Sequence, residues 1–382
     1  GGLPLYRNGV AVGGIGVEGD GLYTIDRDPR DLDQSFEEVI AAHGTRGFEA
    51  PALVRADNIL VEGLRFPFSN VEEITSGNVI PFASLPGTEA VMVRSAPPSD
   101  FVAGTVNGVA GQFSSRFPTT AGSALSLAEV QQILGEAVAV ANKTRAGIRQ
   151  PIGSNARVTI AVVDVDGRVL GIFRQADAPV FGLDVSVQKA RSANFFARSD
   201  AGAKLTAAGF GSFVTRAATD GIPLNGSIAF SDRAIGFLHR PLFPDGINRT
   251  QAGPFSTELV DWSPFNVGLQ LALIENELKM PSMACNPIAR RIRRRPLAPC
   301  PCTALPELKN GIQIFAGSLP IYRGSTLIGA VGVSGDGIDQ DDLIAAAGAN
   351  NFAPPESIRS DRFFVRGVRL PFLKFPPRPF VN

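Results

Sequence analysis

Apolar residues recur with helical spacing between residues 125 and 145. Six of them form a single stripe, as expected when one face of a helix is buried. The stripe consists of Val130, Ile133, Leu134, Ala137, Val138 and Ala141. Ser126 and Glu129 have the spacing of a capping box, which marks a helix start. The pattern therefore predicts a helix over residues 125–145.

A run of β-branched and small apolar residues follows, from Arg157 to Asp164, and it is typical of a buried strand. The pair Asp166-Gly167 comes next and is a strong hairpin signal. Residues 168–174 supply the second strand, and residues 175–179 form a polar turn. A second helix is predicted from about Phe181 to Arg198.

One pattern occurs twice, at residues 1–21 and again at residues 317–337. Between the two copies 11 of the 21 aligned residues are identical. The first copy reads as two short strands around Asn8-Gly9, and spaced glycines follow that permit close approach of another element. With a changed offset the similarity continues through a short helix, predicted from Asp33 to about Ala42, into an extended arm. The repeat predicts that both ends of the chain fold alike.

The layout suggests three parts. Residues 1–76 hold the first copy, and residues 77–122 read as a Gly- and Pro-rich linker with one or two edge strands. Residues 123–382 hold the helix, the hairpin, the second helix and the second copy. A long, less regular insertion occupies about 202–310 within that last part.

Composition, charge and motifs argue against several classes of function. The net charge is zero, so no overall field favours nucleic acid or an anionic membrane. The basic run Arg290–Arg295 is short and lacks aromatic residues, so we do not expect nucleic-acid binding. No apolar run is long enough for a membrane span. Three cysteines, Cys285, Cys300 and Cys302, leave the disulfide state open. We find no catalytic signature and expect no metal site.

The order of these motifs resembles the GlcG/HbpS family, which includes the C-terminal domain of PduO-type proteins. The resemblance covers about residues 125–201 and 311–350. It rests on four features: the first helix, the hairpin with Val162-Val163-Asp164, the second helix with Lys189-Ala190-Arg191, and the late glycine-rich strand. It implies an α+β, profilin-like fold in which an antiparallel sheet is flanked by helices. It also implies binding of haem or a related tetrapyrrole, in some members tied to redox sensing.

The chain departs from that family in two ways. An insertion of about a hundred residues separates the second helix from the glycine-rich strand. Residues 1–76 correspond only to the later half of a module, so the first copy lacks a helix–hairpin–helix part. Because a half module exposes a sheet edge and an apolar face, we expect a complementary segment. An upstream piece of a tandem precursor is favoured over another chain.

The candidate binding residues are few. His239 could be an axial haem ligand and the neighbouring Arg240 could meet a propionate. Lys189, Arg191 and Arg174 could form an anion-binding corner, although ordinary ion pairing explains them as well. His43 suits a helix C-terminus. Tyr6 and Tyr322 occupy the same position in the two copies, and we interpret them as residues at the edge of the core.

The leading hypothesis is a non-enzymatic protein that binds haem or another small ligand outside the cytoplasm, in the periplasm or secreted. A second hypothesis is an accessory subunit of a larger assembly, homo- or hetero-oligomeric, without a ligand of its own. A third hypothesis is an enzyme of small hydroxy-acid metabolism, and it is suggested only by the association of the family with glycolate use.

Overall fold

The computed structural model describes residues 1–17, 36–69, 100–244, 247, 249–258, 267–279 and 303–375. The chain divides into two compact units, Gly1–Ala96 and Pro97–Asn382. Several features predicted from the sequence lie outside the described residues. They are the end of the first repeat copy at residues 18–21, the predicted start of the short helix at Asp33, residues 77–99 of the linker, the basic run Arg290–Arg295 and the three cysteines.

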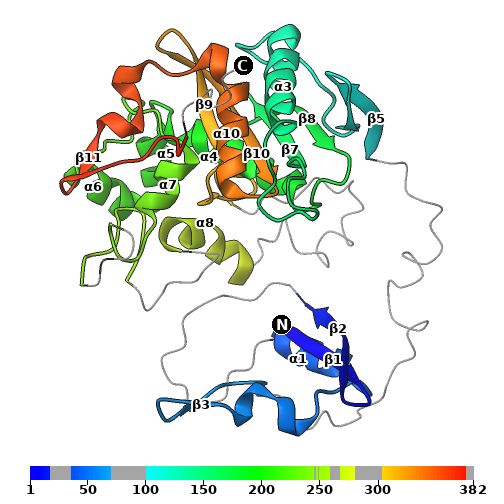
Figure 1. Cartoon of the computed structure of the whole chain (residues 1–382). Coiled ribbons are helices and arrows are strands. Elements are labelled where there is room, and N and C mark those ends of the chain that lie inside the picture. Colours follow the sequence, from blue (N-terminus) through cyan, green and yellow to red (C-terminus); the bar gives the residue numbers. More distant parts are fainter. Residues whose placement is uncertain are drawn as a thin grey trace, which may run out of the picture. The chain divides into compact units, whose positions relative to one another are not determined.

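The second unit is built on one antiparallel sheet of six strands (Figure 1), in the order β5-β6-β8-β7-β10-β9. The strands are β5 (Phe101–Val106), β6 (Val109–Ser114), β7 (Val158–Val163), β8 (Val169–Gln175), β9 (Ser318–Arg323) and β10 (Thr326–Gly335). The predicted hairpin is β7–β8, and β10 lies beside β7 with Val331 opposite Val162. Residues from two distant parts of the chain therefore form the centre of one sheet.

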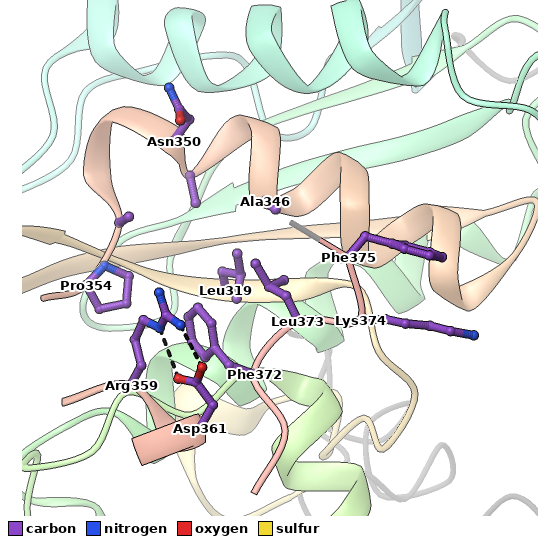
Figure 2. A pocket seen from close by; sticks show the side chains of 12 residues that line it. Leu319, Ala346, Asn350, Pro354, Arg359, Asp361, Phe372, Leu373, Lys374 and Phe375 are labelled. Atoms are coloured by element: carbon purple, nitrogen blue, oxygen red, sulfur yellow. Dashed lines mark hydrogen bonds and ion pairs between the residues drawn. The ribbon is translucent and has the colours of Figure 1, made fainter. Parts of the chain in front are cut away.

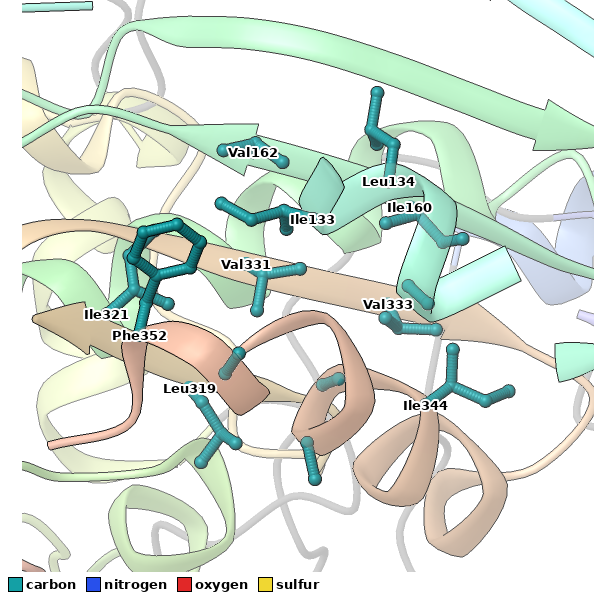
Figure 3. Close-up of a cluster of buried hydrophobic side chains, with 14 of the residues drawn as sticks. Ile133, Leu134, Ile160, Val162, Leu319, Ile321, Val331, Val333, Ile344 and Phe352 are labelled. Atoms are coloured by element: carbon teal, nitrogen blue, oxygen red, sulfur yellow. The ribbon is translucent and has the colours of Figure 1, made fainter. Parts of the chain in front are cut away.

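Helices cover both faces of this sheet. On one face lie α3 (Leu127–Ala141) and α10 (Ile338–Gly348), which pack against each other. Their apolar residues meet alternate strand residues such as Ile160, Val162 and Val331 in the main core (Figure 3). The opposite face is covered by α4 (Gly182–Phe196), whose Val187 and Ala190 contact the intervening residues. The predicted α+β fold, with an antiparallel sheet flanked by helices, is confirmed.

The first predicted helix begins as the sequence indicates. Ser126 accepts a hydrogen bond from the backbone N–H of Glu129, and the Glu129 carboxylate accepts one from the backbone N–H of Ser126. This reciprocal cap satisfies two backbone donors that the first turn would leave unpaired. All six residues of the predicted stripe are buried.

The insertion builds a second hydrophobic core rather than a loop. Its helices are α5 (Ala201–Ala207), α6 (Gly211–Thr219), α7 (Asp232–Leu238) and α8 (Gly268–Lys279), followed by the short 3₁₀ helix η5 (Pro306–Leu308). Phe196 at the end of α4 joins this core, and so do Val365 and Leu370 of the C-terminal arm. Arg366 forms a two-point ion pair with Asp220 that fixes the arm against the insertion.

Residues 100–122 contain the edge strands expected within residues 77–122. The hairpin β5–β6 pairs with β8 and extends the sheet at that edge. Its turn is Asn107-Gly108, with both residues at positive φ. Phe113 of β6 packs on Phe173 at a ring distance of 5.0 Å, which joins the hairpin to the main core.

The two ends of the chain fold into the same series of elements. The first unit contains β1 (Gly2–Arg7), β2 (Val10–Gly16), α1 (Phe36–Gly44), η1 (Ala52–Val54), η2 (Ala56–Asn58), β3 (Leu60–Val61) and β4 (Leu64–Arg65). The second unit matches it with β9, β10, α10, η7 (Glu356–Ile358), η8 (Ser360–Arg362), β11 (Phe364–Val365) and β12 (Val368–Arg369). One further 3₁₀ turn, η6 (Asn350–Phe352), follows α10.

Side-chain contacts repeat as well. Arg55 binds Asp57 and lies over the ring of Phe68, at 4.8 Å from its centre. Arg359 binds Asp361 and lies over Phe372 at 5.1 Å. The predicted structural repeat is thus present down to individual ion pairs.

Candidate functional site

A cavity of about 370 Å³ lies between the insertion and the C-terminal arm of the second unit. Because three arginines contribute to its wall, we call it the arginine cavity. Its described lining residues are Arg233, Gly236, Phe237, Arg240, Ile314, Phe315, Ala316, Ile338, Arg369, Leu370 and Pro371. These residues come from α7, the segment before β9, the start of α10 and β12.

Close packing of α7 forms one wall of this cavity. The helix starts at Ser231, whose hydroxyl accepts a hydrogen bond from the Ala234 N–H and donates one to the Phe372 carbonyl oxygen at 2.6 Å. Gly236 lies so close to residues 314–316 that a Cβ at this position would be 1.9 Å from the Ile314 carbonyl oxygen. Glycine therefore lets α7 approach residues 314–316 and brings Phe237 to the cavity.

Arg233 is held in place by two carboxylates. Its Nη2 lies 2.8 Å from Asp339 Oδ1, and its Nε lies 3.0 Å from Asp342 Oδ2. Burial raises the pKa of Asp342, while the charge of Arg233 opposes that rise. The guanidinium is fixed at the wall because both of its acidic partners belong to α10.

Arg240 follows α7 directly and is half-buried, whereas Arg369 lies on β12 and is exposed. None of the cavity's described lining residues is Asp or Glu. The wall thus combines three cationic side chains with apolar surface from Phe237 and Ile314 among others. This combination suits a ligand with an apolar body and a carboxylate or other anionic group, since guanidinium binds such groups with two parallel hydrogen bonds.

His239 does not share this cavity with Arg240. It is 1% exposed, its Nδ1–H donates to the Ile235 carbonyl oxygen at 2.7 Å, and its ring lies 5.3 Å from that of Phe255. Its Nε2 has no hydrogen-bond partner among the described residues. Burial lowers the pKa of His239 to about 4, so the ring is neutral at pH 7. The sequence predicts that His239 and Arg240 contact the same ligand, but the structure places only Arg240 at the cavity.

The predicted anion-binding corner is not formed. Lys189 is buried and pairs with Asp341 at 2.9 Å. Arg191 donates from Nε to the Gly167 carbonyl oxygen and from Nη1 to Asn310. Arg174 donates to Gln112 and to the carbonyl oxygen of Ala178. Each cation already serves a different structural contact, so the three do not converge on one ligand.

A second cavity, of about 320 Å³, lies between α10 and the C-terminal arm (Figure 2). Leu319, Ala346 and Phe372 give it apolar walls, and Arg359 bound to Asp361 forms part of its edge. Arg359 has a carboxylate partner, as Arg233 does in the arginine cavity, but the lining of the arginine cavity contains two further arginines and so attracts an anion more strongly.

Tyr322 lies in the wall of a third cavity, of about 480 Å³. Its hydroxyl has no hydrogen-bond partner among the described residues, and burial raises its pKa, so it stays a neutral phenol. Polar residues dominate this lining, including Asp166 and Asp200. Tyr322, interpreted from the sequence as a residue at the edge of the core, also lines this cavity. The two carboxylates of the lining disfavour an anionic ligand in the cavity.

Haem can be tested against these linings. Its carboxylates and apolar ring suit the arginine cavity, but that cavity's described lining contains no His, Cys, Met or Tyr for the iron. The cavity that contains Tyr322 offers an oxygen donor but a polar wall with two carboxylates. The described residues of neither cavity fit the whole group.

No group of three or more His, Cys, Asp or Glu side chains among the described residues is arranged to hold a metal ion. No helix in the described part of the chain has the length and apolarity needed to cross a membrane.

Comparison with known proteins now identifies the chain's relatives. Residues 278–350, which include β9, β10 and α10, match the family model for haem degrading protein HbpS-like. This stretch of the chain is similar to that family. This agrees with the resemblance found in the sequence. No curated protein matches the sequence.

Three solved structures are similar to this chain. Klebsiella pneumoniae protein ORFY is 22% identical, with 59% of this chain and 88% of that chain covered at a TM-score of 0.31. A complex of PduOC with haem is 16% identical, with 59% and 94% covered at a TM-score of 0.27. A double mutant of Streptomyces reticuli HbpS is 16% identical, with 61% and 89% covered at a TM-score of 0.27.

Proposed function

We propose that this GlcG/HbpS-like protein is a non-enzymatic binding protein for a small ligand with an apolar body and an anionic group, held in the arginine cavity. One observation supports the proposal most: three arginines and no described acidic residue line a cavity that is otherwise largely apolar. The cavity volume lies in the usual range for small-ligand sites.

Binding at this site would use the three arginines differently. Arg233 is fixed by Asp339 and Asp342, so it orients a ligand with little loss of its own freedom. Arg369 is exposed and is suited to reach a carboxylate at the mouth. Phe237 and Ile314 would contact the apolar body of the ligand.

Haem belongs to this ligand class, and it is the ligand named for the HbpS-like family model and for the PduOC complex. Its two carboxylates would meet the arginines, and its ring would meet the apolar wall. We expect its iron to receive no ligand from the described lining residues, so a metal-free porphyrin should bind about as well.

The experiment is a titration of the full chain with haem and with metal-free protoporphyrin, followed by absorption and fluorescence. Arg240→Gln and Arg369→Gln should each weaken binding roughly ten-fold or more, because a hydrogen bond to a charged group contributes about 1.5–3 kcal/mol. Arg116→Gln is the matched control, since Arg116 is an exposed arginine that pairs with Asp100 away from the cavity.

Two outcomes would refute the proposal. One is the absence of any saturable binding. The other is binding that both cavity variants leave unchanged. A haem absorption band that only His239→Phe abolishes would instead support His239 as the iron ligand. Haem could then reach His239 only if the region around Phe255 opened.

The accessory-subunit hypothesis remains the second candidate because of the first unit. Its β2 strand pairs only with β1 among the described residues and is largely exposed. Chromatographic mass of the native material, with and without cross-linking, separates a lone monomer from a subunit of an assembly. An extracytoplasmic location is also part of the proposal, and cell fractionation tests it.

A further inference from the structure

Equivalent residues in the two copies differ sharply in exposure. Val12 of β2 is 56% exposed, whereas its counterpart in β10, Ile328, is 1% exposed. Ile40 of α1 is 57% exposed, whereas its counterpart in α10, Ile344, is fully buried. The sequence keeps apolar residues at positions where the first unit has nothing to cover them among the described residues.

The second unit shows what covers such positions. The antiparallel strand β7 pairs with β10 along the edge that is equivalent to the unpaired edge of β2. The helix α3 packs on α10 and takes part in the core around Ile344. The helix α4 covers the other face of β10. All three elements come from one continuous helix–hairpin–helix segment, residues 126–201.

Two glycines of β2 give independent support. A Cβ at Gly332 of β10 would lie 2.1 Å from the Ser186 carbonyl oxygen, so only glycine lets α4 pack there. A Cβ at its counterpart Gly16 would meet nothing within 4 Å. The same contrast holds for the next pair. A Cβ at Gly329 would lie 2.2 Å from the Val163 carbonyl oxygen of β7. A Cβ at its counterpart Gly13 would have only a methyl group of Leu5 nearby, at 4.0 Å.

Glycine inside a strand costs about 0.5–1 kcal/mol relative to alanine, because it gains conformational freedom in the unfolded chain and buries no side chain. The first unit by itself supplies no steric reason for Gly13 and Gly16. A neighbouring strand and helix that approach closely would supply it, as β7 and α4 do for the second copy.

We propose that the surface formed by β1, β2 and α1 binds a helix–hairpin–helix polypeptide segment built like residues 126–201. One strand of this segment pairs antiparallel with β2, one helix passes over Gly16, and the other covers Ile40. This partner surface is separate from the arginine cavity and independent of the proposed ligand.

A second copy of this chain is not the partner we expect. Its own residues 126–201 already pack on its own β9, β10 and α10 with high complementarity. The partner is therefore a further segment of the same design.

The test uses the full chain and, as a probe, a separate polypeptide comprising residues 123–201. Amide hydrogen exchange in β2 and α1 is followed with and without the probe. We expect exchange at Gly14 and Gly16 to be fast in the chain alone and to slow at least ten-fold when the probe is added. Their N–H groups face the open edge of β2, because the alternating amide of Val17 donates to the Gly1 carbonyl oxygen of β1.

Two substitutions make the test specific. Gly16→Val should leave the chain alone unchanged, since its side chain meets nothing, yet it should abolish protection by the probe because a helix could no longer approach. Gly14→Ala is the matched control and should retain protection, because the covered copy carries Ala330 at the equivalent buried position.

Four outcomes would overturn the proposal. The first is strong protection of β2 in the monomeric chain without probe, which means that the chain covers this surface itself. The second is protection only at dimer mass, which makes a second copy the occupant. The third is protection that Gly16→Val does not affect, and the fourth is no protection with the probe at all.

Discussion

Lys189 Nζ lies 2.9 Å from Asp341 Oδ2, and both side chains are almost completely removed from solvent. The same ammonium group donates to the Val333 carbonyl oxygen at 2.9 Å. Burial raises the pKa of Asp341 to about 6, while the charge of Lys189 opposes that rise. The pair links α4 to α10 beside Gly317, which follows the arginine cavity's lining residue Ala316.

Replacing Lys189 should therefore be costly. Lys189→Met leaves the Asp341 carboxylate buried without its cation, and breaking a buried pair in this way typically costs about 3–5 kcal/mol. We expect a matching fall in the free energy of unfolding, measured by urea denaturation and circular dichroism. Arg116→Met is the control, because its ion pair with Asp100 is exposed and should cost at most about 1 kcal/mol. Equal losses for the two variants would contradict the structural role of Lys189.

The sequence could not reveal this role. Lys189 and Arg191 are two residues apart on a helix, so they face different directions, which already argues against a common anion site. The burial of Lys189 depends on Asp341, which is 152 residues away. Only the packing of β10 beside α4 brings them together.

Elements with a strong local pattern were predicted well. The hairpin β7–β8 follows from a buried run and Asp166-Gly167, and the start of α3 follows from its capping box. The hairpin β5–β6 was predicted less well, although Asn107-Gly108 carries the same turn signal as Asn8-Gly9. Its glycine-rich strands resemble a linker because their burial comes from Phe173 across the sheet.

The arginine cavity illustrates the limit of sequence reasoning. Arg233, Arg240 and Arg369 come from a helix, the residues after it and the C-terminal arm. No spacing in the sequence relates the first two to the third. The arm reaches them because Arg366 is fixed to Asp220 of the insertion.

The equivalent glycines allow a paired measurement of stability in the isolated chain. Gly332→Ala should destabilise the second unit by about 1–3 kcal/mol, since the new methyl group would overlap the Ser186 carbonyl oxygen. Gly16→Ala should change little or should stabilise the first unit slightly. Amide exchange resolved for each unit measures both. A large loss in the Gly16 variant would show that the first unit is already closely covered.

His239 predicts a pH dependence of stability. Burial lowers its folded-state pKa to about 4 from an ordinary value of 6.5, so the unfolded chain binds a proton in this pH range that the folded chain does not. The contribution of His239 to stability should therefore fall by about 3 kcal/mol as the pH is lowered from about 6.5 to about 4. Asp341 acts in the opposite direction, because its raised pKa makes the folded chain bind a proton as the pH falls through about 6.

A variant separates the two effects. His239→Phe keeps a ring beside Phe255 but removes the titration, so the variant should lose less stability than the wild type between pH 6.5 and pH 4. The measurement is the urea midpoint of both proteins at several pH values within that window. The difference should change steadily in favour of the variant as the pH falls and should be constant above pH 7, since neutral histidine is the form present in both states there. Parallel curves would mean that His239 titrates normally, and the ring would then have to be exposed rather than buried against Phe255.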